Sequence, residues 1–103
     1  MAVYKVKEIG RGMNNITVVL KIISKGKERV VMTKYGESRV ATAIGEDDTG
    51  RINLTLWRDQ IDMINEGDVV KLIGAFVTEF RGQLSLNIGK GGKIEVISSS
   101  SRN

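Results

Sequence analysis

The stretch Arg51-Ile52-Asn53-Leu54-Thr55-Leu56-Trp57 alternates polar and apolar residues without a break. Successive side chains of a β-strand face opposite sides of the sheet, so its three aliphatic residues are expected to face a core. Trp57 then falls on the solvent side, together with Arg51, Asn53 and Thr55. A large flat ring on a polar and basic face is suited to stacking on a planar ligand, and nucleic acid bases are such ligands.

Further strand-like runs lie on both sides of this stretch. Two segments are candidates for helical structure, residues 59–65 and part of residues 2–15. In residues 59–65, Ile61 and Ile64 share one face, and Glu66-Gly67 ends the run. Residues 2–15 predict a short helical turn or an irregular segment that caps the core, because Gly10 and Gly12 interrupt its helical spacing. Asp47-Asp48-Thr49-Gly50 predicts a tight turn, and Gly89-Lys90-Gly91-Gly92 a loop. Strands are expected at 16–24, 29–33 (a second strand or a hairpin arm), 39–44, 51–57, 68–80, 83–88 and 93–97.

This order is typical of an all-β protein, a five-stranded OB-fold barrel with a short helix between strands 3 and 4. The alternative is an SH3-like barrel, which does not normally carry that helix. The chain has 103 residues, enough for one small domain, which we place at residues 1–97. Residues 98–103 are expected to form a disordered tail.

Composition narrows the classes of function. The net charge of +4 moderately favours acidic partners. The chain has no cysteine and no histidine, which excludes thiol nucleophiles, Cys/His zinc sites and the usual general base. We therefore expect no enzyme activity, no metal and no cofactor. Neither a 20-residue apolar span nor a signal-peptide core is present, so the sequence predicts a soluble intracellular protein.

Two phenylalanines extend the candidate stacking surface. Residues 70, 72 and 74 have the period of a buried face, so an unbent strand would place Phe76 in the core. A bulge at Gly74 would instead turn Phe76 to the face of Trp57. Phe80 shares the face of Phe76 and precedes the turn Arg81-Gly82, in a loop position where OB folds commonly bind ligands.

Basic and uncharged polar residues supply the remaining candidate contacts. Arg51 is the best supported cation because it shares the face of Trp57, and Lys34 lies in the long hairpin that OB folds also use. The candidate phosphate contacts are Arg29, Lys34, Arg39, Arg51, Arg58, Arg81 and Lys90. The candidate polar contacts to bases or sugars are Thr33, Asn53, Thr55, Gln83, Ser85 and Asn87.

The sequence also resembles a known family, the simple single-OB single-stranded DNA-binding proteins of archaea and their eukaryotic relatives, which carry domains like those of replication protein A. The resemblance covers about residues 14–97 and is carried by the segments 45–51, 54–57, 64–70, 74–76, 80–86 and 89–92. In that family three aromatic rings on one face stack bases, and the matching positions here are Trp57, Phe76 and Phe80. Relatives of the eukaryotic type place a further aromatic residue where this chain has Asn87.

The resemblance implies a protein that binds single-stranded DNA with little sequence preference and protects it in replication, recombination and repair. It would be cytoplasmic and nucleoid-associated in an archaeon, or nuclear in a eukaryote. Replication or repair proteins are candidate further partners, and no membrane partner is expected. The sequence leaves the oligomeric state open between a monomer, which is slightly favoured, and two copies paired through exposed edge strands. Two alternatives stay open: an OB module that binds single-stranded RNA or tRNA, and an OB domain that mainly holds a protein partner.

Overall fold

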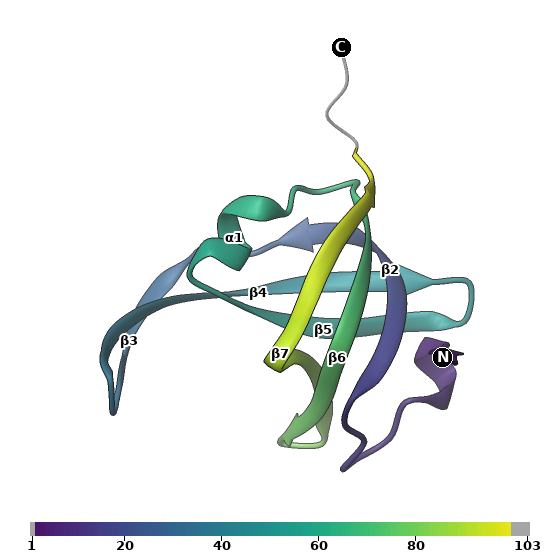
Figure 1. The fold of residues 1–103 in the computed structure, drawn as a ribbon, viewed down its shortest axis with the longest axis horizontal. Helices are drawn as coiled ribbons and strands as arrows, with labels where there is room; N and C mark the ends of the chain where they lie inside the picture. The colour runs from purple at the N-terminus through teal and green to yellow at the C-terminus, as the bar shows by residue number, and fades with distance from the viewer. Residues whose placement is uncertain (1, 100–103) are drawn as a thin grey trace.

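The computed structural model describes residues 2–99, and about two thirds of these residues lie in strands (Figure 1). A short 3-10 helix, η1 (Val6–Glu8), follows the first strand, and the helix α1 (Asp59–Met63) lies between the fifth and sixth. The strands are β1 (Val3–Tyr4), β2 (Ile16–Lys25), β3 (Arg29–Thr33), β4 (Gly36–Asp47), β5 (Gly50–Trp57), β6 (Val69–Phe80) and β7 (Gln83–Ser98).

The sheet closes into a ring. Its strand order is β1-β2-β6-β7-β5-β4-β3, and an additional pairing between β2 and β4 joins the two sides. In chain order the ring strands are β2, β4, β5, β6 and β7, so α1 stands between the third and fourth of them, as predicted. The predicted count of five strands was wrong, because β1 and β3 are also strands and bring the number in residues 2–99 to seven.

The predicted loop at residues 89–92 was also wrong. The strands expected at 83–88 and 93–97 form one long strand, β7, which passes through all three glycines. A Cβ atom on Gly92 would lie 2.5 Å from the carbonyl oxygen of Ile73 on β6. The missing side chain therefore lets the two backbones stay paired through a point of close approach.

The core fills the inside of the ring. Val18, Leu20, Leu54, Leu56 and Leu72 are at most 1% exposed, and the alternation along β5 places its aliphatic residues there as predicted. The N-terminal segment caps one end, as predicted, with Ile9 buried.

The N-terminal segment is held by the β4–β5 turn. The Asp47 carboxylate accepts hydrogen bonds from the backbone N–H of Val6 (2.8 Å) and from the backbone and hydroxyl of Thr49 (2.7 and 2.6 Å). Burial alone would raise the pKa of Asp47, but these hydrogen bonds outweigh it and lower the pKa below its ordinary value. Lys5 pairs with Asp48 at 2.8 Å, which lowers the pKa of that carboxyl group as well.

The helix α1 is held by two cations. The Lys25 ammonium donates hydrogen bonds to the carbonyl oxygens of Ile61 and Ile64, each at 2.8 Å. The Arg39 guanidinium lies 3.0 Å from Asp62 and 3.2 Å from Glu28. The hydrogen bond from Arg39 lowers the pKa of Asp62, and the same contact raises the pKa of Arg39. Residues 4–9 and 47–50 lie on one side of the molecule and α1 lies on the other (Figure 1); we call these two parts, together with Lys25, Arg39 and Ile64, the supporting region.

Candidate nucleic-acid interface

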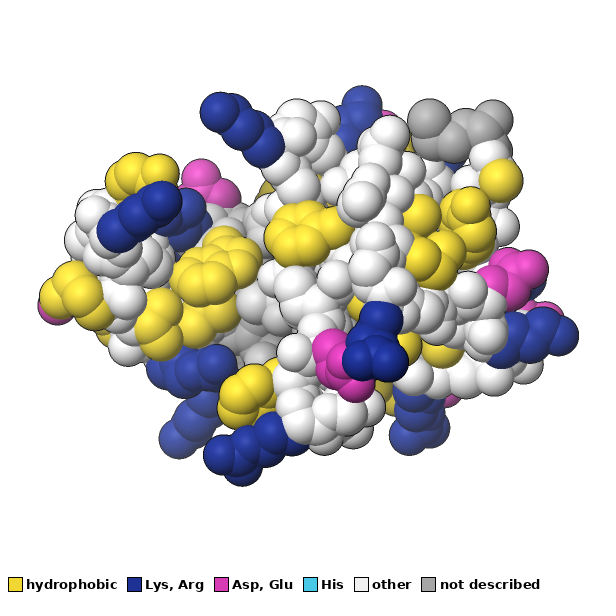
Figure 2. All heavy atoms as spheres, turned by 90° about the horizontal axis from the view of Figure 1, so that it is seen from below, with side chains coloured by type: hydrophobic (Ala, Val, Ile, Leu, Met, Phe, Trp, Pro, Cys, Tyr) yellow, Lys and Arg dark blue, Asp and Glu magenta, His cyan; other side chains and the backbone are white. Residues whose placement is uncertain are grey.

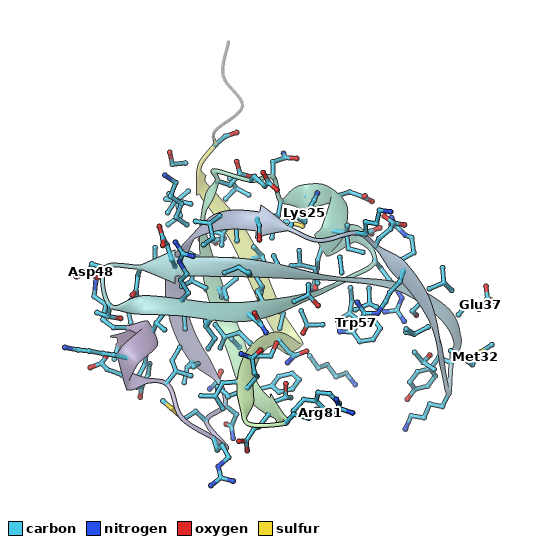
Figure 3. The ribbon with its side chains drawn as sticks, turned by 180° about the vertical axis from the view of Figure 1, so that it is seen from behind. Lys25, Met32, Glu37, Asp48, Trp57 and Arg81 are labelled. Atoms are coloured by element: carbon cyan, nitrogen blue, oxygen red, sulfur yellow. The ribbon has the colours of Figure 1, made fainter. Side chains whose placement is uncertain are left out.

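Trp57 lies at the end of β5, outside the core. The three aliphatic residues of the strand are at most 7% exposed, whereas Trp57 is half-buried on the opposite side. In Figure 3 its side chain lies between the β3–β4 hairpin and the β6–β7 turn that carries Arg81. The face predicted for Trp57 from the alternation is therefore confirmed.

Phe76 reaches the same face because β6 contains a bulge. The register between β6 and β7 shifts between Ile73 and Ala75, and Gly74 between them has a φ of +73°. After the bulge Ala75 and Val77 are buried, so Phe76 points outward. Of the two alternatives that the sequence left open, the bulge is the one that forms.

The central strand β7 brings the three rings into one array. Phe76 lies opposite Asn87, and Phe80 lies opposite Gln83 at the turn, where its side chain is 72% exposed. On the other side of β7, Asn53 of β5 lies opposite Ser85. The rings of β5 and β6 therefore flank a strip of polar side chains on β7.

These polar side chains are hydrogen-bonded to one another. Thr55 Oγ1 lies 3.0 Å from Ser85 Oγ, Asn53 donates to Gln83 Oε1 at 3.2 Å, and Asn87 donates to Thr78 Oγ1 at 3.0 Å. Thr78 was missed as a candidate, although the period of two that links Phe76 and Phe80 includes it. We define the aromatic face as Trp57, Phe76 and Phe80 with the strip Asn53, Thr55, Thr78, Gln83, Ser85 and Asn87.

The Lys and Arg side chains near this face differ in the groups that they contact. Arg81 lies over the ring of Phe80, with Cζ 5.0 Å from the ring centroid. Arg58 donates a hydrogen bond to Ser38 Oγ at 2.8 Å, and Arg51 pairs with Glu46 at 3.2 Å while remaining 68% exposed. Lys90 and Arg29 are exposed. Figure 2 shows exposed hydrophobic side chains with Lys and Arg side chains around them on the lower side of the molecule.

Arg39 is the predicted cation that the structure places elsewhere. Val40 lies opposite Trp57 in the β4–β5 pairing, so its neighbour Arg39 falls on the other side of the sheet. There it is held by Asp62 and Glu28. Sequence spacing gave no sign of this, because Asp62 lies on a different element.

The β3–β4 hairpin ends beside Trp57. Thr33 Oγ1 accepts a hydrogen bond from the backbone N–H of Tyr35 (3.1 Å) and donates one to the carbonyl oxygen of Gly36 (2.8 Å). Thr33 therefore shapes the turn, and the base contact expected of it stays a prediction. Met32 and Glu37 point away from Trp57 in Figure 3.

Two hollows mark the ends of the aromatic face. One, of about 400 Å³, is lined by Thr33, Lys34, Tyr35, Trp57 and Arg58. The other, of about 540 Å³, lies beside Phe76 and includes Asn14, Asn15 and Lys90 with the glycines of β7. Within residues 2–99 no group of three acidic side chains is placed to hold a metal ion. The same part of the chain contains no helix long and apolar enough to cross a membrane.

Comparisons with known proteins identify the family and the fold. The family model of Ssb-like single-stranded DNA-binding proteins with an OB fold matches residues 10–96. The single-stranded DNA-binding protein Ssb of Saccharolobus solfataricus is 38% identical over 90 residues, which cover 87% of this chain and 61% of that protein. The chain thus spans less than two thirds of that relative's length.

Solved structures show the same fold. The OB domain of Ta0387 from Thermoplasma acidophilum is 25% identical, with a TM-score of 0.81 over 98% of this chain and 92% of that one. The second OB-fold domain of replication protein A from Methanococcus maripaludis aligns over 98% of this chain and all of that domain, with a TM-score of 0.78 and 21% identity. The match of the family model over residues 10–96 shows that the chain belongs to the family of Ssb-like, OB-fold single-stranded DNA-binding proteins.

Proposed function

We propose that this chain binds single-stranded DNA with little sequence preference by stacking bases on Trp57, Phe76 and Phe80. The observation that carries the proposal is the placement of three rings from two strands on one exposed face, around polar side chains. Every base has a flat face, so stacking tolerates all sequences, and each stack contributes about 1–3 kcal/mol.

The polar strip supports the same reading. Its hydrogen bonds run between side chains of β5, β6 and β7, and they occupy groups that could otherwise discriminate base edges. Of the predicted polar contacts we retain five as residues that contact the sugars and bases of the bound DNA: Asn53, Thr55, Gln83, Ser85 and Asn87. A site of this kind on one OB fold spans about 4–16 nucleotides, and three rings favour the lower end of that range.

Phosphate contacts are assigned to the cations beside the rings: Lys34, Arg58, Arg81, Lys90, Arg29 and Arg51. Arg81 and Lys34 lie against aromatic rings, so their charges are not neutralised by those contacts. Arg39 is left out because two carboxylates hold it on the other side of the sheet. In the cell such binding would protect single strands during replication, recombination and repair, and it requires no chemical step on the strand.

The test is a binding titration with three labelled ligands: oligo-dT, oligo-U of the same length, and a blunt DNA duplex. Fluorescence anisotropy at two salt concentrations should show tight binding of oligo-dT and much weaker binding of the duplex. The logarithm of the affinity should fall with the logarithm of salt, with a slope of about −0.7 per phosphate neutralised.

Each of the three ligands tests a different part of the proposal. Tighter binding of oligo-U than of oligo-dT would assign the site to RNA. Equal binding of duplex and single strand would contradict base stacking, since duplex bases are already stacked on one another. Failure to bind any of the three would overturn the proposal and leave the protein-partner alternative.

A further inference from the structure

The hollow beside the β3–β4 hairpin is lined by a second aromatic ring besides Trp57. Tyr35, at the tip of the β3–β4 hairpin, and Trp57, at the end of β5, line the same hollow of about 400 Å³. That volume lies in the range of about 300–1,000 Å³ that is usual for clefts that bind small molecules. The two residues are 22 positions apart in the sequence, and the fold brings both to one hollow.

Tyr35 has no evident role in folding. Its side chain is 83% exposed, so packing in the core does not explain a large ring at this position. Its backbone is nevertheless fixed, because Thr33 Oγ1 accepts the hydrogen bond of the Tyr35 N–H and donates to Gly36, which has a φ of +109°. The hairpin thus presents an exposed ring on a shaped turn.

Two cations, Lys34 and Arg58, line the same hollow. The Lys34 ammonium lies 5.4 Å from the centroid of the Tyr35 ring. The chain turns sharply at Arg58, which has a φ of +52°, and the Arg58 guanidinium donates a hydrogen bond to Ser38 Oγ. A planar group that enters this hollow would therefore lie near two rings and two positive charges, as suits a base with its flanking phosphates.

We propose that Tyr35 and Trp57 form a slot that takes one nucleobase of a bound single strand between two rings, with Lys34 and Arg58 at the adjacent phosphates. This inference rests on the proposed function and extends it. The bound DNA strand would run from the β6–β7 turn across the aromatic face to the β3–β4 hairpin. Tyr35 would be a fourth stacking residue, beyond the three that the sequence predicted.

The test compares Tyr35→Ala with Tyr35→Phe and with Met32→Ala. Met32 is 75% exposed on the same hairpin but points away from Trp57, so Met32→Ala controls for loss of an exposed apolar side chain (Figure 3). We expect Tyr35→Ala to weaken oligo-dT binding by about 5-fold to 150-fold, the range expected when one stack is removed. Tyr35→Phe and Met32→Ala should remain within about two-fold of the wild type, since one keeps the ring and the other lies outside the slot.

A second measurement locates the base. A set of oligo-dT strands, each with one abasic position, should show a position where base removal weakens the wild type but not Tyr35→Ala. Wild-type affinity in Tyr35→Ala, with no such position, overturns the slot and leaves the proposed function intact. An equal loss in Tyr35→Phe also overturns it, because the hydroxyl and not the ring would then make the contact. Failure of the wild type to bind oligo-dT overturns both proposals together.

Discussion

Cations on the aromatic face and cations in the supporting region have different neighbours. Around the aromatic face Arg81 and Lys34 lie against rings and Arg58 against a hydroxyl. In the supporting region Arg39 and Lys5 pair with carboxylates, and Lys25 binds backbone carbonyl oxygens.

This difference separates two uses of the same residue types. A cation held by carboxylates has its charge balanced within the protein, whereas a cation on a ring keeps its charge for an anion outside. Arg51, paired with Glu46 beside the aromatic face, lies between the two classes. Lys and Arg count alone therefore says little about where a nucleic acid would bind, and the neighbours of each cation say more.

The largest expected effect belongs to the supporting region. Ile64 is fully buried after α1, and its carbonyl oxygen accepts a hydrogen bond from Lys25. Ile64→Ala should lower the free energy of unfolding by about 2–5 kcal/mol, because it leaves a cavity in the core. Urea denaturation measures this, and the folded variant should bind oligo-dT as the wild type does. A loss of affinity for oligo-dT in the fully folded variant would contradict the separation between the supporting region and the aromatic face.

Trp57→Ala should show the opposite pattern. It removes a ring from the aromatic face, so affinity for oligo-dT should fall by about 1–3 kcal/mol, the contribution of one stack. The free energy of unfolding should change less than in Ile64→Ala, because Trp57 is only half-buried. Trp57→Phe is the matched control and should retain most of the affinity. A variant that lost stability and kept its affinity would show that Trp57 is a packing residue.

The turn at Asp47 predicts a pH dependence of the free energy of unfolding. The pKa of Asp47 is lowered in the folded protein, so its stabilising contribution is complete above the ordinary value of 3.8 and is lost as pH falls through the folded pKa. Asp47→Asn should lower the free energy of unfolding by about 1–3 kcal/mol at neutral pH, through loss of charged hydrogen bonds. The difference from the wild type should shrink below pH 3.8. Denaturation curves across this range would contradict the assignment if the difference stayed constant.

The smallest effect tests the cations themselves. Arg81→Gln should make the salt dependence of oligo-dT binding shallower by about 0.7 for each phosphate that the side chain no longer neutralises. Arg39→Gln, its matched control, should leave that slope unchanged because Asp62 and Glu28 already balance the charge. Equal changes in the two variants would remove the distinction between the two groups of cations.

The sequence predicted most strands of the closed sheet. It also predicted the face on which Trp57 lies, because the alternation along residues 51–57 is uninterrupted. The position of Phe76 depended on one glycine. Its two alternatives differed by a single bulge, and the pattern of β6 before Gly74 could not decide whether the bulge forms.

Long-range pairings could not be predicted in this way. The contact of Arg39 with Asp62 and the meeting of Tyr35 with Trp57 join elements that are distant in the sequence. Glycines were a further source of error, since residues 89–92 have the composition of a loop but continue a strand beside the backbone of β6. In each case the deciding contact is made with another element, so the local sequence pattern cannot predict it.

The most direct test of stacking on the aromatic face uses the emission of Trp57, the single tryptophan of the chain. Oligo-dT should quench that emission in a saturable way, with the same midpoint as the anisotropy titration, and the duplex should leave it nearly unchanged. Binding of oligo-dT detected by anisotropy without any change in Trp57 emission would contradict the account, because the strand would then lie on a different surface.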